Sequence, residues 1–108
     1  MGVGLEGMRT IACDFDGVIH DWAHPKPGRK MGAPMPGTKE ALGLLKSAGY
    51  TIIIHSCNRA QVIKDFMNYY QLPYDSIWEG QGKPVADWYL DDNGLRFENW
   101  NETLAAIL

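Results

Sequence analysis

Short apolar runs alternate along this chain with segments in which apolar residues recur at helical spacing. The runs are continuous rather than alternating in polarity, which is typical of parallel strands covered on both faces. The expected strands are residues 9–14, 51–55, 76–78 and 88–90, and the expected helices are residues 38–48, 60–70 and 100–107. This order predicts an α/β domain, and we expect a three-layer α/β/α Rossmann-like fold with a central parallel sheet.

The chain is long enough for one such domain and no more. It has 108 residues, of which 45% are hydrophobic, as is ordinary for a protein that buries a core. We expect residues 1–7 to be a flexible leader and residues 8–108 to form the single domain. No run is apolar enough to span a membrane, and no signal peptide is apparent at the start.

Charge and cysteine content bear on the binding partners of the protein and on the compartment in which it works. The formal charge is −3, so composition indicates no general attraction to nucleic acid or to anionic lipid, although it leaves a local basic patch open. The two cysteines, Cys13 and Cys57, are fewer than a small secreted scaffold usually carries. We therefore expect reduced thiols and a cytoplasmic protein. The sequence indicates no particular oligomeric state.

Four further local signals complete the expected structure. Residues 18–36 hold four of the six prolines in the chain, which predicts an irregular loop. Residues 84–86 are expected to form a helical turn, and residues 95–97 a short edge strand. Asn99 is expected to cap the last helix.

Polar side chains follow three of the expected strands. Asp14 ends the first strand and Asp16 comes two residues later, Ser56 follows the second, and Asp91 and Asp92 follow the fourth. Ligands bind at the carboxyl ends of the strands in sheets of this kind. We therefore expect these side chains to meet around one cleft.

The crowded carboxylates predict a cation. Two carboxylates ~4 Å apart repel each other by roughly 4 kcal/mol at an effective dielectric constant near 20. Mg²⁺ prefers oxygen ligands and few protein contacts, so Asp14, Asp16, Asp91 and Asp92 are the candidate metal ligands. Gly17 allows the chain to turn sharply after Asp16. Either acidic pair alone is also explained by a turn that favours Asp and Gly.

Ser56 and Lys83 are the candidates for holding a phosphoryl group. A hydroxyl and an ammonium can bind its non-bridging oxygens while charge redistributes in the reaction. Arg59 follows Ser56 closely and is a candidate substrate contact, although it can equally well begin the helix at residue 60.

Four short motifs occur in the order found in the haloacid dehalogenase superfamily of phosphohydrolases, which the sequence resembles from residue 13 to residue 92. They are Asp14-Phe15-Asp16-Gly17-Val18, Ile52-Ile53-Ile54-His55-Ser56, Gly82-Lys83-Pro84 and Tyr89-Leu90-Asp91-Asp92. Each motif is short and degenerate on its own. The complete set in this order is specific.

The resemblance implies a phosphatase that forms an aspartyl-phosphate on Asp14. Asp16 would act as general acid and then general base, and an acidic residue there favours phosphatase or phosphotransferase chemistry, because ion-pumping members carry Thr. Mg²⁺ would be held by Asp14, the backbone carbonyl of Asp16, and either Asp91 or Asp92. Which of the last two contacts the metal is left open by the motif.

The resemblance also assigns the remaining candidates and the kind of substrate. Ser56 would bind a phosphoryl oxygen, and Lys83 would screen the charge of the nucleophile. The intervals between the motifs have no room for a cap domain, so the chain resembles the small capless members. Their open sites often accept large phosphorylated substrates, and a partner subunit can serve as the lid. Residues 18–36 would then be the main specificity element, or simply a solvated loop near the active site.

The function expected from the sequence is hydrolysis of a phosphate monoester with Mg²⁺ as cofactor. Two alternatives are a phosphatase that acts on nucleic-acid ends and a non-catalytic module that binds phosphate or a partner protein. The intact set of candidate residues counts against the module, because a protein without catalysis is free to lose them.

Overall fold

A four-stranded parallel sheet forms the centre of the computed structural model, which describes residues 9–25, 32–56, 59–80, 84–91 and 97–108. The strand order is β5-β4-β1-β6, so the first strand of the chain lies inside the sheet. The strands are β1 (Arg9–Asp14), β4 (Tyr50–His55), β5 (Ser76–Ile77) and β6 (Trp88–Leu90), and every pairing between them is parallel.

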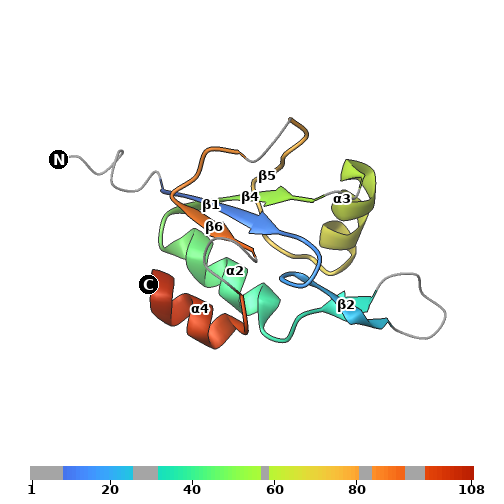
Figure 1. Ribbon diagram of the computed structural model, residues 1–108, viewed down its shortest axis with the longest axis horizontal. Helices are drawn as coiled ribbons and strands as arrows, with labels where there is room; N and C mark the ends of the chain where they lie inside the picture. Colours follow the sequence, from blue (N-terminus) through green and yellow to red (C-terminus); the bar gives the residue numbers. More distant parts are fainter. Residues whose placement is uncertain (1–8, 26–31, 57–58, 81–83, 92–96) are drawn as a thin grey trace.

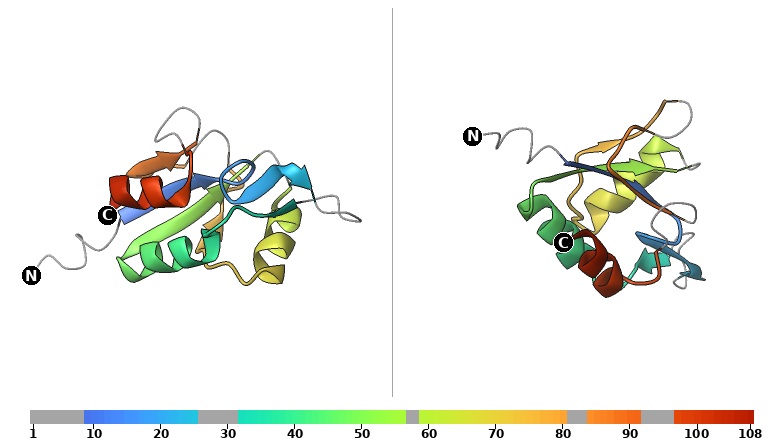
Figure 2. Two further views of the ribbon diagram at one scale, coloured as in Figure 1. Left: turned by 90° about the horizontal axis from the view of Figure 1, so that it is seen from below. Right: turned by 60° about the vertical axis from the view of Figure 1, so that its left-hand side comes forward.

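Three helices flank this sheet: α2 (Thr38–Ser47), α3 (Ala60–Tyr69) and α4 (Trp100–Ile107). Helices α2 and α4 lie together beneath the sheet, and α3 lies beside β5 (Figures 1 and 2). The described parts of the connection from β5 to β6 pass over the opposite face (Figure 2). The α/β class and the central parallel sheet are confirmed, and the layering is consistent with the expected Rossmann-like three-layer fold.

The core joins alternate residues of the two central strands to the helices. Ile11 is the Cα partner of Ile52 and Cys13 that of Ile54, so these four side chains share one face of the sheet, and all are buried in the main apolar cluster. On the other face Thr51 is exposed. The apolar run of β4 is therefore covered unequally on its two sides, unlike the run expected for a strand buried on both faces.

The segment expected to be an irregular loop, residues 18–36, instead contains a two-stranded hairpin. Strands β2 (His20–Pro25) and β3 (Gly32–Pro34) pair in antiparallel fashion, with His20 opposite Pro34 and Pro25 opposite Gly32. Pro25 and Pro34 misled the prediction because each ends a strand of a separate two-stranded ribbon, where a missing N–H removes no bond from the central sheet. The register shifts between His20 and Pro25, which marks a bulge or irregularity in the ribbon.

The remaining predicted elements agree with the structure with one exception. Helices α2 and α3 end one residue earlier than expected, and α4 ends at the expected residue. Asn99 caps α4, because its side chain accepts a hydrogen bond from the backbone N–H of Glu102 at 2.9 Å. The expected helical turn at residues 84–86 is wrong, because these residues are irregular and lead directly into β6. The leader, residues 95–96 of the expected edge strand, and Cys57 lie outside the described residues.

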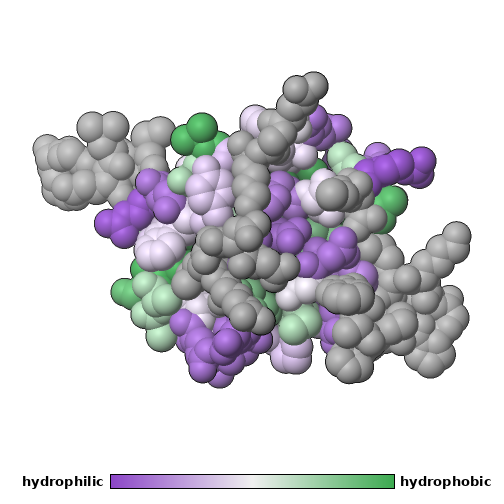
Figure 3. All heavy atoms as spheres, viewed as in Figure 1, coloured by the Kyte–Doolittle hydropathy of each residue, from purple (hydrophilic) through white to green (hydrophobic). Residues whose placement is uncertain are grey.

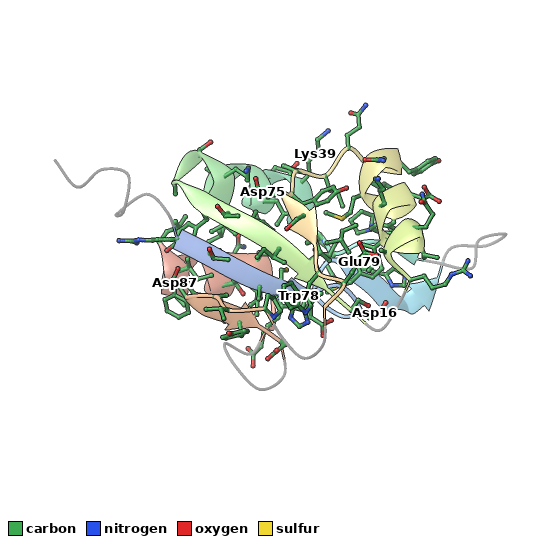
Figure 4. All side chains as sticks on the ribbon, turned by 90° about the horizontal axis from the view of Figure 1, so that it is seen from above. Asp16, Lys39, Asp75, Trp78, Glu79 and Asp87 are labelled. Carbon is green, nitrogen blue, oxygen red and sulfur yellow. The ribbon has the colours of Figure 1, made fainter. Side chains whose placement is uncertain are left out.

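Two aspartates that are not in the predicted site form hydrogen bonds with backbone groups at the amino end of the sheet. Asp87 accepts a hydrogen bond from the backbone N–H of Thr10 at 2.8 Å and donates its own N–H to the carbonyl of Thr10 at 2.9 Å. Asp75 does the same with Ile52, at 2.7 and 2.9 Å. Figure 4 shows Asp87 at the opposite end of the sheet from Asp16.

No helix within the described ranges is long and apolar enough to cross a membrane.

Candidate active site

The carboxyl ends of β1, β4 and β6 bring three ionisable residues to one edge of the sheet. Asp14, the last residue of β1, is the Cα partner of His55, the last residue of β4. On the other side of β1, Cys13 is paired with Leu90, so Asp91 leaves β6 beside Asp14. Hydrophilic residues gather over this end of the strands in Figure 3.

The electrostatic environment of Asp14 reflects these neighbours. Burial raises the pKa of its carboxyl group, and the charges of Asp16 and Asp91 raise the pKa further. The backbone N–H of Phe15, which donates to Asp14 Oδ1 at 2.8 Å, and a positive charge on His55 act in the opposite direction. The net result is a half-buried carboxyl group whose ionised form is disfavoured.

A tight turn directs Asp16 back to this edge. Gly17 has a φ of 83°, a left-handed conformation that a residue with a Cβ adopts only at a cost. The N–H of Gly17 donates to the carbonyl of His20 at 2.9 Å, and the N–H of His20 donates to the carbonyl of Phe15 at the same distance. The glycine that follows the second aspartate is thus required by the backbone of the turn.

Asp16 receives a contact that the sequence did not suggest. Its Oδ1 lies 2.8 Å from Nδ1 of His20, the first residue of β2. The side chain of Asp16 is 41% exposed, whereas that of His20 is 7% exposed. The carboxyl group of Asp16 is therefore partly open to solvent, and the imidazole that contacts it is buried.

The other predicted site residues are placed as follows. Ser56 comes directly after β4 and is partly buried, and Arg59 is exposed at the start of α3. Lys83 and Asp92 lie outside the described residues. Asp14, Asp16 and Asp91 are thus the members of the predicted set that the structure shows acting on one another.

The oxygen atoms at this edge of the sheet are of the type that binds Mg²⁺ in proteins. Within the ranges described, no three His, Cys, Asp or Glu side chains are grouped so as to hold a metal by themselves. Mg²⁺ does not need such a group, because it is usually bound by one or two carboxylates together with waters and phosphate oxygens. Asp14, Asp91 and the backbone carbonyl of Asp16 supply donors of this type.

Two histidines at the edge were missed as site residues in the sequence. His20 stands in the segment read as a loop, and His55 precedes the serine of the second motif. Nε2 of His55 is buried and has no hydrogen-bond partner among the described residues. Only the register of β1 with β4 reveals that His55 is beside Asp14. The contact of His20 with Asp16 spans four residues, but it depends on the turn at Gly17 and on burial of the imidazole, which the motif does not indicate.

A polar cavity of about 510 Å³ opens between the first turns of α3 and strand β5. Its lining includes Gln61, Lys64, Ser76 and Glu79. Glu79 follows the carboxyl end of β5, and Figure 4 shows Glu79, Trp78 and Asp16 toward the same end of the sheet. Asp14, Asp16 and Asp91 are not among the residues that line this cavity.

Comparison with known proteins identifies the fold. No family model and no curated protein matches the chain. A conserved protein from Bacteroides thetaiotaomicron is similar with a TM-score of 0.70 and 25% identity, over 91% of this chain and 88% of that chain. A chain of the Pnkp1/Rnl/Hen1 RNA repair complex is similar with a TM-score of 0.53 and 22% identity, over 79% of this chain and 36% of that chain. The chain therefore shares its α/β architecture with the first of these proteins over nearly its whole length and with part of the second.

Proposed function

We propose that this protein is a Mg²⁺-dependent phosphatase of the haloacid dehalogenase type, with Asp14 as its nucleophile. The observation that carries the proposal is the environment of Asp14 at the carboxyl end of β1. Burial and the charges of Asp16 and Asp91 raise the pKa of this carboxyl group. A cation would offset the mutual repulsion and restore an ionised nucleophile.

The reaction divides into two displacements at phosphorus. In the first, a carboxylate oxygen of Asp14 bonds to phosphorus, the bond from phosphorus to the leaving oxygen breaks, and Asp16 gives its proton to that oxygen. In the second, a water molecule attacks the phosphorus, its proton passes to Asp16, and the bond to Asp14 breaks. The sum is a phosphate ester plus water giving an alcohol plus phosphate, with both aspartates restored.

Mg²⁺ would be held by Asp14, the backbone carbonyl of Asp16 and Asp91 or Asp92, and when bound it neutralises charge on the transferred phosphoryl group. Ser56 would donate a hydrogen bond to a phosphoryl oxygen. Lys83 would place a positive charge near the nucleophile. The exposed guanidinium of Arg59 at the start of α3 is available to a substrate group beyond the phosphate.

The elements between the motifs support an open site. From Asp16 to Ser56 the described residues form the β2–β3 hairpin, α2 and β4, and from Ser56 to Lys83 they form α3 and β5. Neither interval contains a further domain in these ranges. A substrate larger than a small metabolite can therefore approach the carboxyl ends of the strands.

Hydrolysis of p-nitrophenyl phosphate tests the proposal. We expect turnover that requires Mg²⁺, stops with EDTA and falls at least about a thousandfold in Asp14→Asn. Asp65→Asn is the matched control, because Asp65 is exposed on α3 and accepts a hydrogen bond from the side chain of Gln61 in the preceding turn. Activity without added metal, or equal activity in Asp14→Asn, would refute the mechanism.

The substrate range separates the remaining possibilities. A panel of phosphorylated metabolites and of oligonucleotides with terminal phosphates measures the release of phosphate from each. Selective release from oligonucleotide ends would assign a nucleic-acid-end phosphatase. Binding of phosphate without turnover of any ester would assign a non-catalytic module instead.

A further inference from the structure

His20 forms a buried support for the carboxyl group of Asp16. Nδ1 of His20 lies 2.8 Å from Asp16 Oδ1, and the residue as a whole is 5% exposed. A hydrogen bond with a carboxylate at this distance is among the strong ones in proteins. The contact therefore restricts rotation of the carboxyl group.

The backbone holds both partners of this pair. The carbonyl of Phe15 accepts hydrogen bonds from Ile19 at 3.0 Å and from His20 at 2.9 Å, and the N–H of Gly17 donates to the carbonyl of His20 at 2.9 Å. These hydrogen bonds fix the backbone of the turn from Asp16 to His20. The two side chains are therefore held at a set distance and orientation relative to each other.

Aromatic rings hold the imidazole from two sides. The ring of His20 stacks on that of Phe15 at 5.4 Å and 18°, and meets the edge of Phe66 from α3 at 5.4 Å and 74°. Phe15 and Phe66 also pack edge to face on each other at 5.0 Å. Helix α3 therefore fixes the ring whose nitrogen reaches Asp16.

We propose that His20 is a positioning residue that orients Asp16 for proton transfer to the leaving oxygen. This inference rests on the function proposed above. A general acid contributes about 10²- to 10⁴-fold to a rate, and only when its proton lies within hydrogen-bond reach of the acceptor. The side chain that His20 holds in this way is 41% exposed, so a substrate at the edge of the sheet could reach it.

A purely structural histidine would have a different signature. Loss of a structural contact slows the hydrolysis of every ester alike. Loss of a positioned acid slows the cleavage of alkyl phosphates, whose alkoxide must be protonated, far more than that of p-nitrophenyl phosphate, whose phenolate leaves unaided. Values of kcat/KM report the steps through departure of the leaving group, so they isolate this effect from hydrolysis of the phosphoenzyme.

Two variants distinguish the contribution of the Nδ1 atom of His20 from that of its aromatic ring. His20→Phe keeps a ring between Phe15 and Phe66 but removes the nitrogen, and His20→Asn keeps a donor near the position of Nδ1 but removes the ring. We expect the ratio of kcat/KM for glycerol 2-phosphate to that for p-nitrophenyl phosphate to fall about tenfold or more in His20→Phe. His20→Asn should restore part of that ratio even if its melting temperature is lower.

The variant Asp16→Asn gives the largest fall in the kcat/KM ratio that loss of the general acid can cause. Because His20 acts through Asp16, adding His20→Phe to Asp16→Asn should lower the ratio no further. An equal fall for both esters, no fall in a folded variant, or an additive fall in the double variant overturns the inference while leaving the phosphatase proposal in place. Failure of the wild-type protein to show Mg²⁺-dependent turnover overturns both, and the wild-type assay detects it first.

Discussion

Asp14 and His55 end neighbouring strands as Cα partners, so the candidate nucleophile and a histidine meet at one edge of the sheet. A positive charge on His55 lowers the pKa of Asp14, but burial and the charges of Asp16 and Asp91 act more strongly and raise it. Burial at this edge and the neighbouring acidic side chains therefore make the ionised form of Asp14 unfavourable.

The raised pKa predicts that Asp14 destabilises the protein at neutral pH in the absence of metal. Between the ordinary pKa of Asp and the raised one, the folded state binds more protons than the unfolded state, so the free energy of unfolding falls as pH rises. Asp14→Asn removes this loss and should increase the free energy of unfolding at pH 7. The difference from wild type should shrink as pH falls from the raised pKa toward the ordinary pKa of Asp, and it should disappear below the ordinary pKa.

Urea denaturation in EDTA across this pH range measures the effect. Asp65→Asn, on the exposed face of α3, is the matched control and should follow the wild-type curve. A variant Asp14→Asn that is less stable than wild type at pH 7, or a difference that grows toward acidic pH, would contradict the expected sign.

Magnesium should stabilise the folded protein even without substrate. A ligand that binds only the folded state at 100 times its Kd adds about 2.7 kcal/mol to the free energy of unfolding. We expect the melting temperature to rise with Mg²⁺ concentration in the wild type and in Asp65→Asn, and to stay constant in Asp14→Asn. An equal rise in Asp14→Asn would place the cation elsewhere.

Cys13 should be chemically inert in the folded protein. The side chain is 1% exposed, and burial together with the charge of Asp14 raises the pKa of its thiol. Since the thiolate is the reactive form, Cys57→Ser should react with Ellman's reagent at pH 8 only after unfolding in guanidinium. Rapid reaction of one thiol in the native variant would show that Cys13 is accessible.

The hydroxyl of Thr38 joins the two helices beneath the sheet. It accepts a hydrogen bond from Nε1 of Trp100 at 2.9 Å and donates to the carbonyl of Met35 at 2.6 Å, with both side chains buried. Thr38→Val leaves the indole N–H unpaired and should cost about 1–3 kcal/mol in urea denaturation. The exposed Thr51→Val is the control and should change stability by less than about 0.5 kcal/mol.

The elements of regular structure were largely predictable because their signals are local. The runs 9–14 and 88–90 and the helix 100–107 were expected at their observed bounds. The hairpin was missed because its strands are held together by pairing rather than by apolar content, and the prolines at its edges resemble loop residues. The segment 84–86 was misread as a helical turn, whereas it is irregular and the N–H of Ala86 donates to the hydroxyl of Tyr89 at 3.2 Å.

The candidate site divides in a similar way. The carboxylates of Asp14, Asp16 and Asp91 could be expected together, because parallel strands align their carboxyl ends. The contact of His20 with Asp16 and the pairing of His55 with Asp14 could not. The first depends on the turn at Gly17 and on the packing of Phe66 from a distant helix, and the second on which strand lies next to β1.

Local sequence thus decided where the helices and the strands of the central sheet form and which carboxylates stand at strand ends, because backbone propensity and apolar spacing act over a few residues. The order of the strands, the buried histidine behind Asp16 and the raised pKa of Asp14 were decided only by folding of the whole chain. Each of these depends on which distant segments come together, and the energies of such long-range contacts are not written in any one segment.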